Sequence, residues 1–170
     1  EIAWHDTSIG ATAEYSTNTS KILRQSVITN YQFNSFFISA NLAFNLIKYI
    51  RLTDNYRWII SQSKAGNYIN TIRNVSNETS LDVTFLPDRL LLNTTLQYTH
   101  NSGFTDRKDY IFMTLSITFK PSKKVQLVLN FDNILNTDTF VYRSNSNLTE
   151  GYTLYQLRPR CVMLTTHFAL

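Results

Sequence analysis

The sequence predicts an all-β fold in which about eight antiparallel strands follow one another as an up-and-down meander. Three observations predict this fold: runs in which apolar and polar residues alternate, a composition poor in charge and rich in aromatic residues, and connections that are alternately short and long. Strict alternation places one class of residue on each face of a strand. The chain has 170 residues, which suits one domain, and we assign residues 1–170 to it.

The N-terminal half is expected to hold four strands. They cover residues 8–16, 27–46, 51–61 and 72–86. The second of them alternates most clearly, from Phe36 to Leu46, and the third carries one exception, Asp54, on its apolar face. Pro87 and Asp88 then form a tight turn. The polar stretches 17–26 and 63–71 are expected to be loops.

The C-terminal half is expected to hold four more strands. They cover residues 89–100, 108–120, 125–133 and 156–170. In the second of these, alternate residues from Ile111 to Phe119 are apolar, whereas those between them are mostly polar. A turn at Pro121-Ser-Lys-Lys124 leads to the next alternating run, and a long loop from Asn136 to Leu154 precedes the last strand.

The connections fall into two classes that alternate along the chain. Those after the second, fourth and sixth strands take about four residues or fewer, and the others take roughly seven to twenty. In a meander this places all short connections at one rim and all long ones at the other. Barrels of the bacterial outer membrane have short periplasmic turns and longer extracellular loops, whereas a Greek-key sandwich has no reason to sort its loops. The sequence therefore predicts part of a transmembrane β-barrel.

Composition and charge narrow the function. Charged residues are 16% of the chain and aromatic residues 14%, against about 25% charged residues in soluble domains. This suits a barrel with one apolar face and one uncharged polar face, and it also suits a secreted β-sandwich. The net charge of +4 arises from scattered basic residues without a long run, so no nucleic-acid partner is expected.

Three motifs occur in order near the C-terminus. They are Pro121-Ser-Lys-Lys124, Asn133-Ile-Leu-Asn-Thr137 and Leu157-Arg-Pro-Arg160. Together with the alternating strands between them, they resemble the C-terminal end of TonB-dependent outer-membrane receptors, above all the large outer-membrane β-barrel proteins of Bacteroidota-type Gram-negative bacteria. The resemblance covers about fifty residues. It implies an outer-membrane location and nutrient transport. The implied partners are outer-membrane lipid, the remainder of the barrel and its plug, and, through the full-length protein, TonB and a surface lipoprotein.

The motif residues have local roles that can be argued directly. Asn133 and Asn136 bracket the exit of the seventh strand, because Asn tolerates turn conformations. Pro159 has no N–H to donate and belongs at the start of the last strand. Arg158 and Arg160 would share one face of that strand and lie near outer-leaflet headgroups, unless a bulge intervenes.

The chain departs from the family pattern in ways that leave alternatives open. It ends on Leu170 rather than on an aromatic residue, it contains no plug, and it has far fewer strands than the about 22 of such transporters. It is therefore either a C-terminal piece of a larger barrel or a small closed barrel of eight strands with a structural or adhesion role. A soluble secreted β-sandwich that acts as a binding module is the third alternative.

The sequence offers few residues for chemistry. His5, His100 and His167 lie far apart and none has a second ligand at metal-binding spacing, so we expect no metal, no cofactor and no catalytic site. Ligand contacts are expected in the long loop before the last strand, because aromatic rings there suit stacking on sugars or other flat ligands. The residues concerned are Phe140, Tyr142, Arg143 and Tyr152.

Overall fold

The computed structural model describes residues 7–24, 26–86, 89–102, 109–145 and 150–168, without the side chains of residues 24, 143–145 and 150. These residues form ten strands and no helix. The strands are β1 (Ser8–Arg24), β2 (Val27–Ile47), β3 (Ile50–Ala65), β4 (Tyr68–Leu86), β5 (Leu90–Asn101), β6 (Asp109–Ser122), β7 (Val125–Asp132), β8 (Thr139–Asn145), β9 (Glu150–Gln156) and β10 (Cys161–Phe168).

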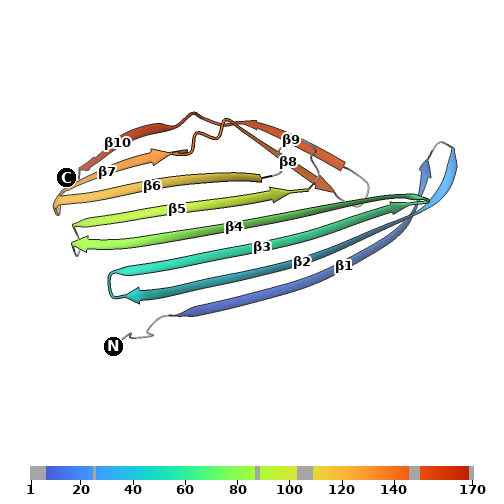
Figure 1. Cartoon of the computed structure of the whole chain (residues 1–170), viewed down its shortest axis with the longest axis horizontal. Coiled ribbons are helices and arrows are strands. Elements are labelled where there is room, and N and C mark those ends of the chain that lie inside the picture. Colours follow the sequence, from blue (N-terminus) through green and yellow to red (C-terminus); the bar gives the residue numbers. More distant parts are fainter. Residues whose placement is uncertain (1–6, 25, 87–88, 103–108, 146–149, 169–170) are drawn as a thin grey trace.

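Eight of the strands form one antiparallel sheet in the order β1-β2-β3-β4-β5-β6-β7-β10 (Figure 1). β8 and β9 pair only with each other. The expected eight-stranded antiparallel meander is thereby confirmed, with one hairpin inserted before its last strand. The sheet is open: among the described residues β1 and β10 are its two edges and do not pair. This contradicts the alternative in which the chain alone forms a small closed barrel.

The register gathers most of the apolar side chains of β5, β6, β7 and β10 on one face. Leu92 pairs with Ile117, Ile117 with Leu129, and Leu129 with Leu164, so one face of the sheet carries a continuous apolar row. We call this the apolar face. On the other side Asn93 pairs with Ser116, and Ser116 with Asn130, and we call this the polar face.

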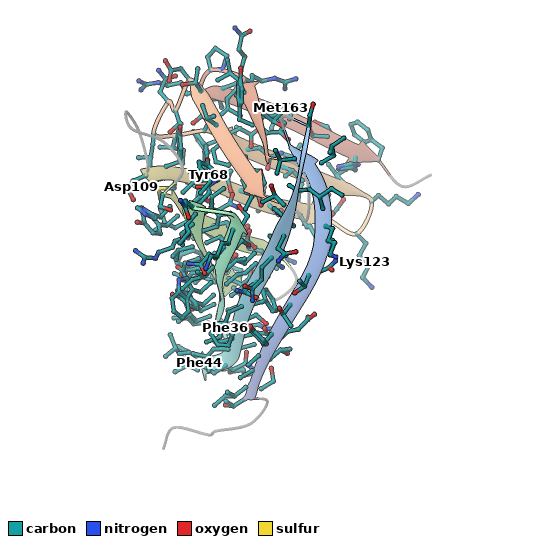
Figure 2. All side chains as sticks on the ribbon, turned by 90° about the vertical axis from the view of Figure 1, so that its right-hand side faces the viewer. Phe36, Phe44, Tyr68, Asp109, Lys123 and Met163 are labelled. Carbon is teal, nitrogen blue, oxygen red and sulfur yellow. The ribbon has the colours of Figure 1, made fainter. Side chains whose placement is uncertain are left out.

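No second layer of described residues covers the apolar face. Leu96, Ile111 and Leu164 are 46%, 44% and 65% exposed. Figure 2 shows side chains on both sides of a single curved sheet, with Phe36 and Phe44 on the same side of it. A β-sandwich buries such a face against another sheet, so this arrangement differs from the sandwich alternative.

Two expected loops are strands instead. β1 continues to Arg24 and β2 starts at Val27, so residues 17–26 are almost entirely paired. In the same way β3 and β4 continue to a two-residue turn at Gly66, whose φ of 61° suits glycine. The reason is that backbone pairing needs no apolar side chains, and polar residues on both faces leave no alternation to detect. The sheet therefore extends further at this end than expected, because residues that were expected in loops are paired in strands.

The expected sorting of short and long connections by rim is wrong for β1–β2 and β3–β4, whose connections are as short as the one between β2 and β3. β2 and β3, β4 and β5, and β6 and β7 are joined at one end of the sheet, which we call the short-turn rim. The hairpins β1–β2, β3–β4 and β8–β9 lie towards the other end, the hairpin rim (Figure 1). β1 begins and β10 ends at the short-turn rim.

The last part of the chain also differs from expectation. The final strand begins at Cys161 rather than at residue 156, and the expected loop from Asn136 to Leu154 contains β8 and most of β9. Residues 157–160 are not strand, and the N–H of Leu157 donates to the carbonyl of Asp138 instead of to a sheet ladder. Arg158 and Arg160 are exposed but do not share a strand face, because Pro159 interrupts the pairing before β10.

Candidate functional site

The polar face is hollowed where β2, β3, β4 and β5 lie side by side. The hollow has a volume of about 370 Å³. The polar-face side chains that line it are Ser39, Asn41, Asn55, Arg57, Ser76, Glu78 and Gln97. The Arg57 guanidinium also lies 5.9 Å from the centre of the Phe37 ring. Amide, guanidinium and carboxylate groups together both donate and accept hydrogen bonds, so this wall suits a polar solute or water.

Hydrogen bonds between neighbouring strands order the polar face beside this hollow. Asn93 donates to Asp82 at 2.6 Å, and the hydroxyls of Ser80 and Thr95 lie 3.0 Å apart. In contrast, Asn55, Arg57 and Glu78 are exposed to solvent. The polar face therefore exposes hydrogen-bonding groups to solvent, and hydrogen bonds between its other polar side chains connect the neighbouring strands.

The β8–β9 hairpin packs on the polar face through Phe140. The Phe140 ring meets the rings of Tyr110 and Phe112 edge-on, with centroid distances of 5.0 and 5.7 Å, and stacks on Tyr155 at 5.9 Å. Tyr110 and Phe112 have the same parity as Thr114 and Ser116, so both belong to the polar face. Tyr110 is only 2% exposed as a result. The hairpin therefore lies over β6 on the side that carries the hollow.

The hairpin also reaches across the sheet towards β3. Tyr142 lines a small cavity of about 100 Å³ together with Arg57, Asn74 and Thr99. These residues come from β3, β4 and β5, so one residue of β8 lies near three consecutive strands of the sheet. The hairpin thus narrows the space above the polar face near the hairpin rim.

The expected ligand-contacting residues are now placed. Phe140 lies at the centre of the aromatic cluster, and Tyr142 lies beside it at 6.5 Å between ring centres. Tyr152 pairs with residue 143 across the hairpin and is 76% exposed. The side chain of Arg143 lies outside the described residues. The structure brings Phe140 and Tyr142 together over the polar face, and their contact with a ligand stays a prediction.

Replacement of Phe140 tests how the hairpin is held. Phe140→Leu keeps most of the apolar volume but removes the aromatic pairs, each of which is worth about 0.5–1.5 kcal/mol. We expect faster cleavage of the β8–β9 hairpin by a protease, with little change in the main sheet. Tyr152→Leu is the matched control, because Tyr152 makes none of these ring contacts among the described residues. Equal cleavage of the two variants would contradict this packing.

Asn133 and Asn136 hold the exit of β7. Both have positive φ, 50° and 55°, a conformation that Asn tolerates better than most residues. The Asn133 amide nitrogen donates to the carbonyls of Thr137 and Arg158, each at 2.8 Å, and its oxygen accepts from the Thr137 N–H at 2.9 Å. The Asn136 side-chain oxygen accepts from the Arg160 N–H at 3.1 Å.

Thr137 completes this group, which we call the asparagine clasp (Asn133, Asn136 and Thr137). Its side chain is almost fully buried at 5% exposure, and its hydroxyl donates to the carbonyl of Ile111 at 2.9 Å. The clasp therefore connects β6, the end of β7 and the segment before β10. The five motif residues Asn133, Asn136, Arg158, Pro159 and Arg160 lie within or next to it, although the two arginines take part through backbone atoms.

The described residues contain no group of three or more His, Cys, Asp or Glu side chains placed to hold a metal ion. Within the same residues there is no helix long and apolar enough to span a membrane. Comparison of the chain with models of known protein families, with curated proteins and with solved structures found no match in any of the three.

Proposed function

We propose that the chain forms part of the wall of a β-barrel in the bacterial outer membrane, of the type found in TonB-dependent receptors that take up nutrients. The observation that carries the proposal is the unequal pair of faces on one sheet. An eight-stranded antiparallel meander carries a continuous apolar row on one face, which the described chain leaves uncovered, and a hydrogen-bonding surface on the other. Contact with lipid would explain the uncovered apolar face, and contact with water would explain the hydrogen-bonding face.

The extent of the exposed apolar surface favours this environment. Monomeric soluble proteins rarely expose contiguous apolar patches beyond about 300–600 Å². Here the exposed apolar side chains extend over neighbouring strands, including Leu96 on β5, Ile111 on β6 and Leu164 on β10. Transfer of such a face out of water is favourable by about 25 cal/mol per Å² of apolar surface. A bilayer supplies that transfer without a second protein layer.

Asp54 is a charged residue within the apolar face, and neighbouring side chains satisfy part of its hydrogen-bonding capacity. Thr79 donates to its carboxylate at 2.6 Å and Asn77 donates at 2.9 Å. Both donors come from β4, the neighbouring strand, so the polar group is held within the sheet itself. This local partnership lowers the cost of a carboxylate near lipid, because buried polar groups are costly mainly when they lack partners.

The open edges support a larger assembly. β1 and β10 each present a row of unpaired backbone groups among the described residues, and such edges need partner strands within a membrane. We infer that the remainder of a wider barrel supplies them, in keeping with the about 22 strands of TonB-dependent transporters. The plug, TonB and a surface lipoprotein would then be partners of that complete barrel.

In a barrel that transports a nutrient, the polar face and the β8–β9 hairpin would have separate roles. The hollow around Asn55, Arg57 and Glu78 would line the aqueous interior. The hairpin, with Phe140, Tyr142, Arg143 and Tyr152, would contact ligand from the hairpin rim, which we assign to the cell exterior. Exposed Arg158 and Arg160 would lie near outer-leaflet headgroups on the same side.

Membrane insertion of the full chain tests the proposal, with the edge strands of neighbouring copies pairing in place of the rest of the barrel. The chain is unfolded in urea and diluted either into buffer or into phosphatidylcholine vesicles. We expect β-sheet circular dichroism and co-flotation with vesicles, resistant to an alkaline wash, only when lipid is present. A monodisperse, folded chain in buffer without lipid or detergent would contradict the proposal, because the apolar face would then be stable in water.

A further inference from the structure

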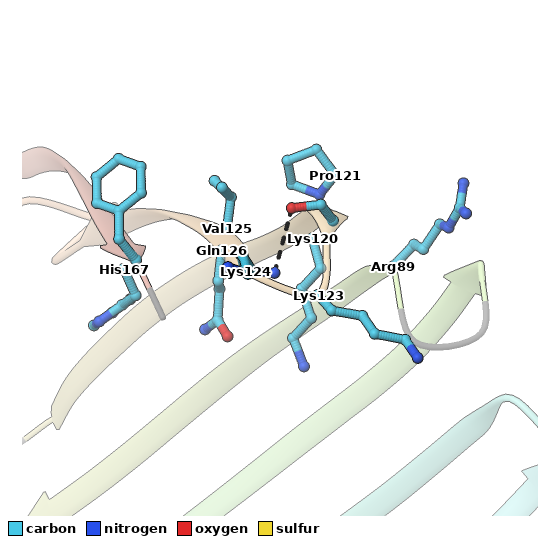
Figure 3. Close-up of a pocket in the computed structure, with 10 residues that line it drawn as sticks. Arg89, Lys120, Pro121, Lys123, Lys124, Val125, Gln126 and His167 are labelled. Carbon is cyan, nitrogen blue, oxygen red and sulfur yellow. Dashed lines mark hydrogen bonds between the residues drawn. The ribbon is translucent and has the colours of Figure 1, made fainter. Parts of the chain in front are cut away.

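The hollow on the polar face, which we now call the polar-face hollow, carries one cation and one anion. They are the side chains of Arg57 on β3 and Glu78 on β4. Another hollow, of about 640 Å³ at the short-turn rim, differs in this respect (Figure 3). The described residues that line it include no carboxylate, and its cationic side chains come from turns and strand ends: Arg89, Lys120, Lys123 and Lys124. The polar-face hollow, in contrast, combines both charges within paired strands.

The register fixes where these two charges stand. Arg57 pairs with Ser76, and Asn55 pairs with Glu78, across β3 and β4. Arg57 and Glu78 are therefore diagonal neighbours on the polar face, an arrangement in which the Cα atoms lie about 7–8 Å apart. Both residues are exposed to solvent. The two strands thus present a positive and a negative group side by side above one polar surface.

The two charged groups do not satisfy each other. Among the described residues no ion pair joins Arg57 to Glu78. The Arg57 guanidinium lies instead 5.9 Å from the centre of the Phe37 ring. The face of an aromatic ring attracts a cation through its quadrupole, without accepting the N–H donors at the edge of the guanidinium plane. Both charged groups therefore keep hydrogen-bonding capacity for a ligand.

Neutral polar groups and the β8–β9 hairpin surround this pair of charges. Side chains that both donate and accept hydrogen bonds line the rest of the hollow. They are Ser39, Asn41, Asn55, Ser76 and Gln97. Towards the hairpin rim, Arg57 and Ser76 also line the small cavity that Tyr142 lines. The two cavities share these residues, so β8 supplies a wall on the side of the hollow next to Arg57.

A solute with an ammonium group and a carboxylate close together matches this arrangement. A guanidinium donates two parallel N–H bonds to a carboxylate, and an ammonium group donates to a carboxylate as a compact point charge. An α-amino acid carries both groups on one carbon atom, so it can bridge Arg57 and Glu78. The hollow has a volume of about 370 Å³, within the range of about 300–1,000 Å³ that small-molecule sites have.

We propose that the polar-face hollow binds a zwitterionic solute of the α-amino acid class. Arg57 binds the carboxylate of the solute, Glu78 binds its ammonium group, and Tyr142 limits the site on the side of the hairpin. This inference rests on the proposed function as part of a transport barrel, and it adds the class of solute that this part of the wall recognises.

Titrations followed by ligand NMR test the site. The full chain, folded in dodecylmaltoside micelles, is titrated with L-glutamine, N-acetyl-L-glutamine or L-glutaminamide, which share one side chain. The acetyl compound lacks the ammonium charge, and the amide lacks the carboxylate. We expect L-glutamine to bind at least about tenfold more tightly than either, because the loss of a hydrogen bond between charged groups changes a binding constant by roughly that factor or more.

Substitutions identify which protein group meets which charge of the ligand. Arg57→Gln should weaken L-glutamine binding about tenfold and leave L-glutaminamide binding unchanged, because the amide has no carboxylate to lose. In the same way Glu78→Gln should weaken the binding of L-glutamine but not that of N-acetyl-L-glutamine. Arg51→Gln is the matched control, because Arg51 lies on the same face of β3 but does not line the hollow. It should bind L-glutamine as the unmodified chain does.

Circular dichroism in the micelles checks that each variant folds. If Arg57→Gln does not fold, Arg57→Lys, which keeps the charge but loses the paired N–H donors, should still weaken L-glutamine binding. Equal binding of the three ligands by the unmodified chain would overturn the inference and indicate a wall for neutral polar solutes. Undiminished L-glutamine binding by the folded Arg57 variant would overturn it as well.

The micelle titrations and the vesicle experiment separate the two proposals. A chain that inserts into phosphatidylcholine vesicles but does not distinguish L-glutamine from its two derivatives contradicts only the amino acid site. A chain that binds L-glutamine selectively in micelles but does not insert into vesicles contradicts only the membrane function.

Discussion

Replacement of Leu115 by arginine is expected to destabilise the chain in a bilayer by about 2–4 kcal/mol, the cost of a basic residue on the lipid face at the membrane midplane. Leu115 lies in the middle of the apolar stripe of β6, between Ile111 and Phe119. It pairs with Thr94 on β5 and Phe131 on β7, so the new charge cannot leave the apolar face without breaking two strand pairings. The measurement is urea unfolding in vesicles, extrapolated to zero denaturant.

Ser116→Arg is the matched control for this prediction. Ser116 adjoins Leu115 but lies on the polar face, where it pairs with Asn93 and Asn130. We expect it to cost less than about 1 kcal/mol, because changes on a water-filled lumen face are tolerated. If the apolar face were in water instead, Leu115→Arg would cost no more than Ser116→Arg. Equal unfolding free energies for the two variants would therefore count against membrane burial of this face.

The part of the fold that the sequence predicts well is the part in which the two faces of each strand carry side chains of opposite character. From Ile111 to Phe119 and from Val125 to Phe131, every second residue is apolar, and these runs are strands in the structure. Residues 16–20, in contrast, are Ser-Thr-Asn-Thr-Ser, with no apolar residue on either face. Backbone pairing still carries β1 and β2 through this stretch, so alternation stops before the strand does.

The β8–β9 hairpin shows why tertiary contacts were harder to predict. Phe140 and Tyr142 do alternate, but only within a seven-residue strand surrounded by polar residues. Tyr110 and Phe112 interrupt the polar face of β6 and look like exceptions in the sequence. The structure shows them as the surface on which Phe140 packs. Two aromatic residues at polar-face positions of a strand were therefore the available signal for a hairpin that packs on that face.

The candidate sites depend on residues that sequence alone does not bring together. The hollow on the polar face draws side chains from β2, β3, β4 and β5, and their register depends on turns that were expected to be longer. The clasp was predicted only in part. Asn133 and Asn136 were expected at the end of β7. The backbone groups that they bond, the carbonyl of Arg158 and the N–H of Arg160, belong to a distant segment. Thr137 was not singled out, although it follows the asparagines in the motif.

Replacement of Asn133 by alanine is expected to release the segment between β7 and β10 and to lower the free energy of unfolding by about 3–4 kcal/mol. Three side-chain hydrogen bonds are lost, each worth about 1 kcal/mol. Alanine at a φ of 50° adds a backbone cost of about 1 kcal/mol. Urea unfolding gives the total, and amide hydrogen exchange at Thr137 reports the local opening.

Glycine variants divide this loss into its two causes. Asn133→Gly keeps access to positive φ and should recover about 1 kcal/mol relative to alanine, because glycine adopts this conformation without the Cβ clash. Asn136→Gly removes only the acceptor for the Arg160 N–H and should cost about 1 kcal/mol. If Asn133→Gly is as stable as the unmodified chain, the three hydrogen bonds contribute nothing and the clasp is merely a turn. If Asn133→Gly and Asn133→Ala are equally unstable, the backbone conformation adds nothing and the three hydrogen bonds account for the whole loss.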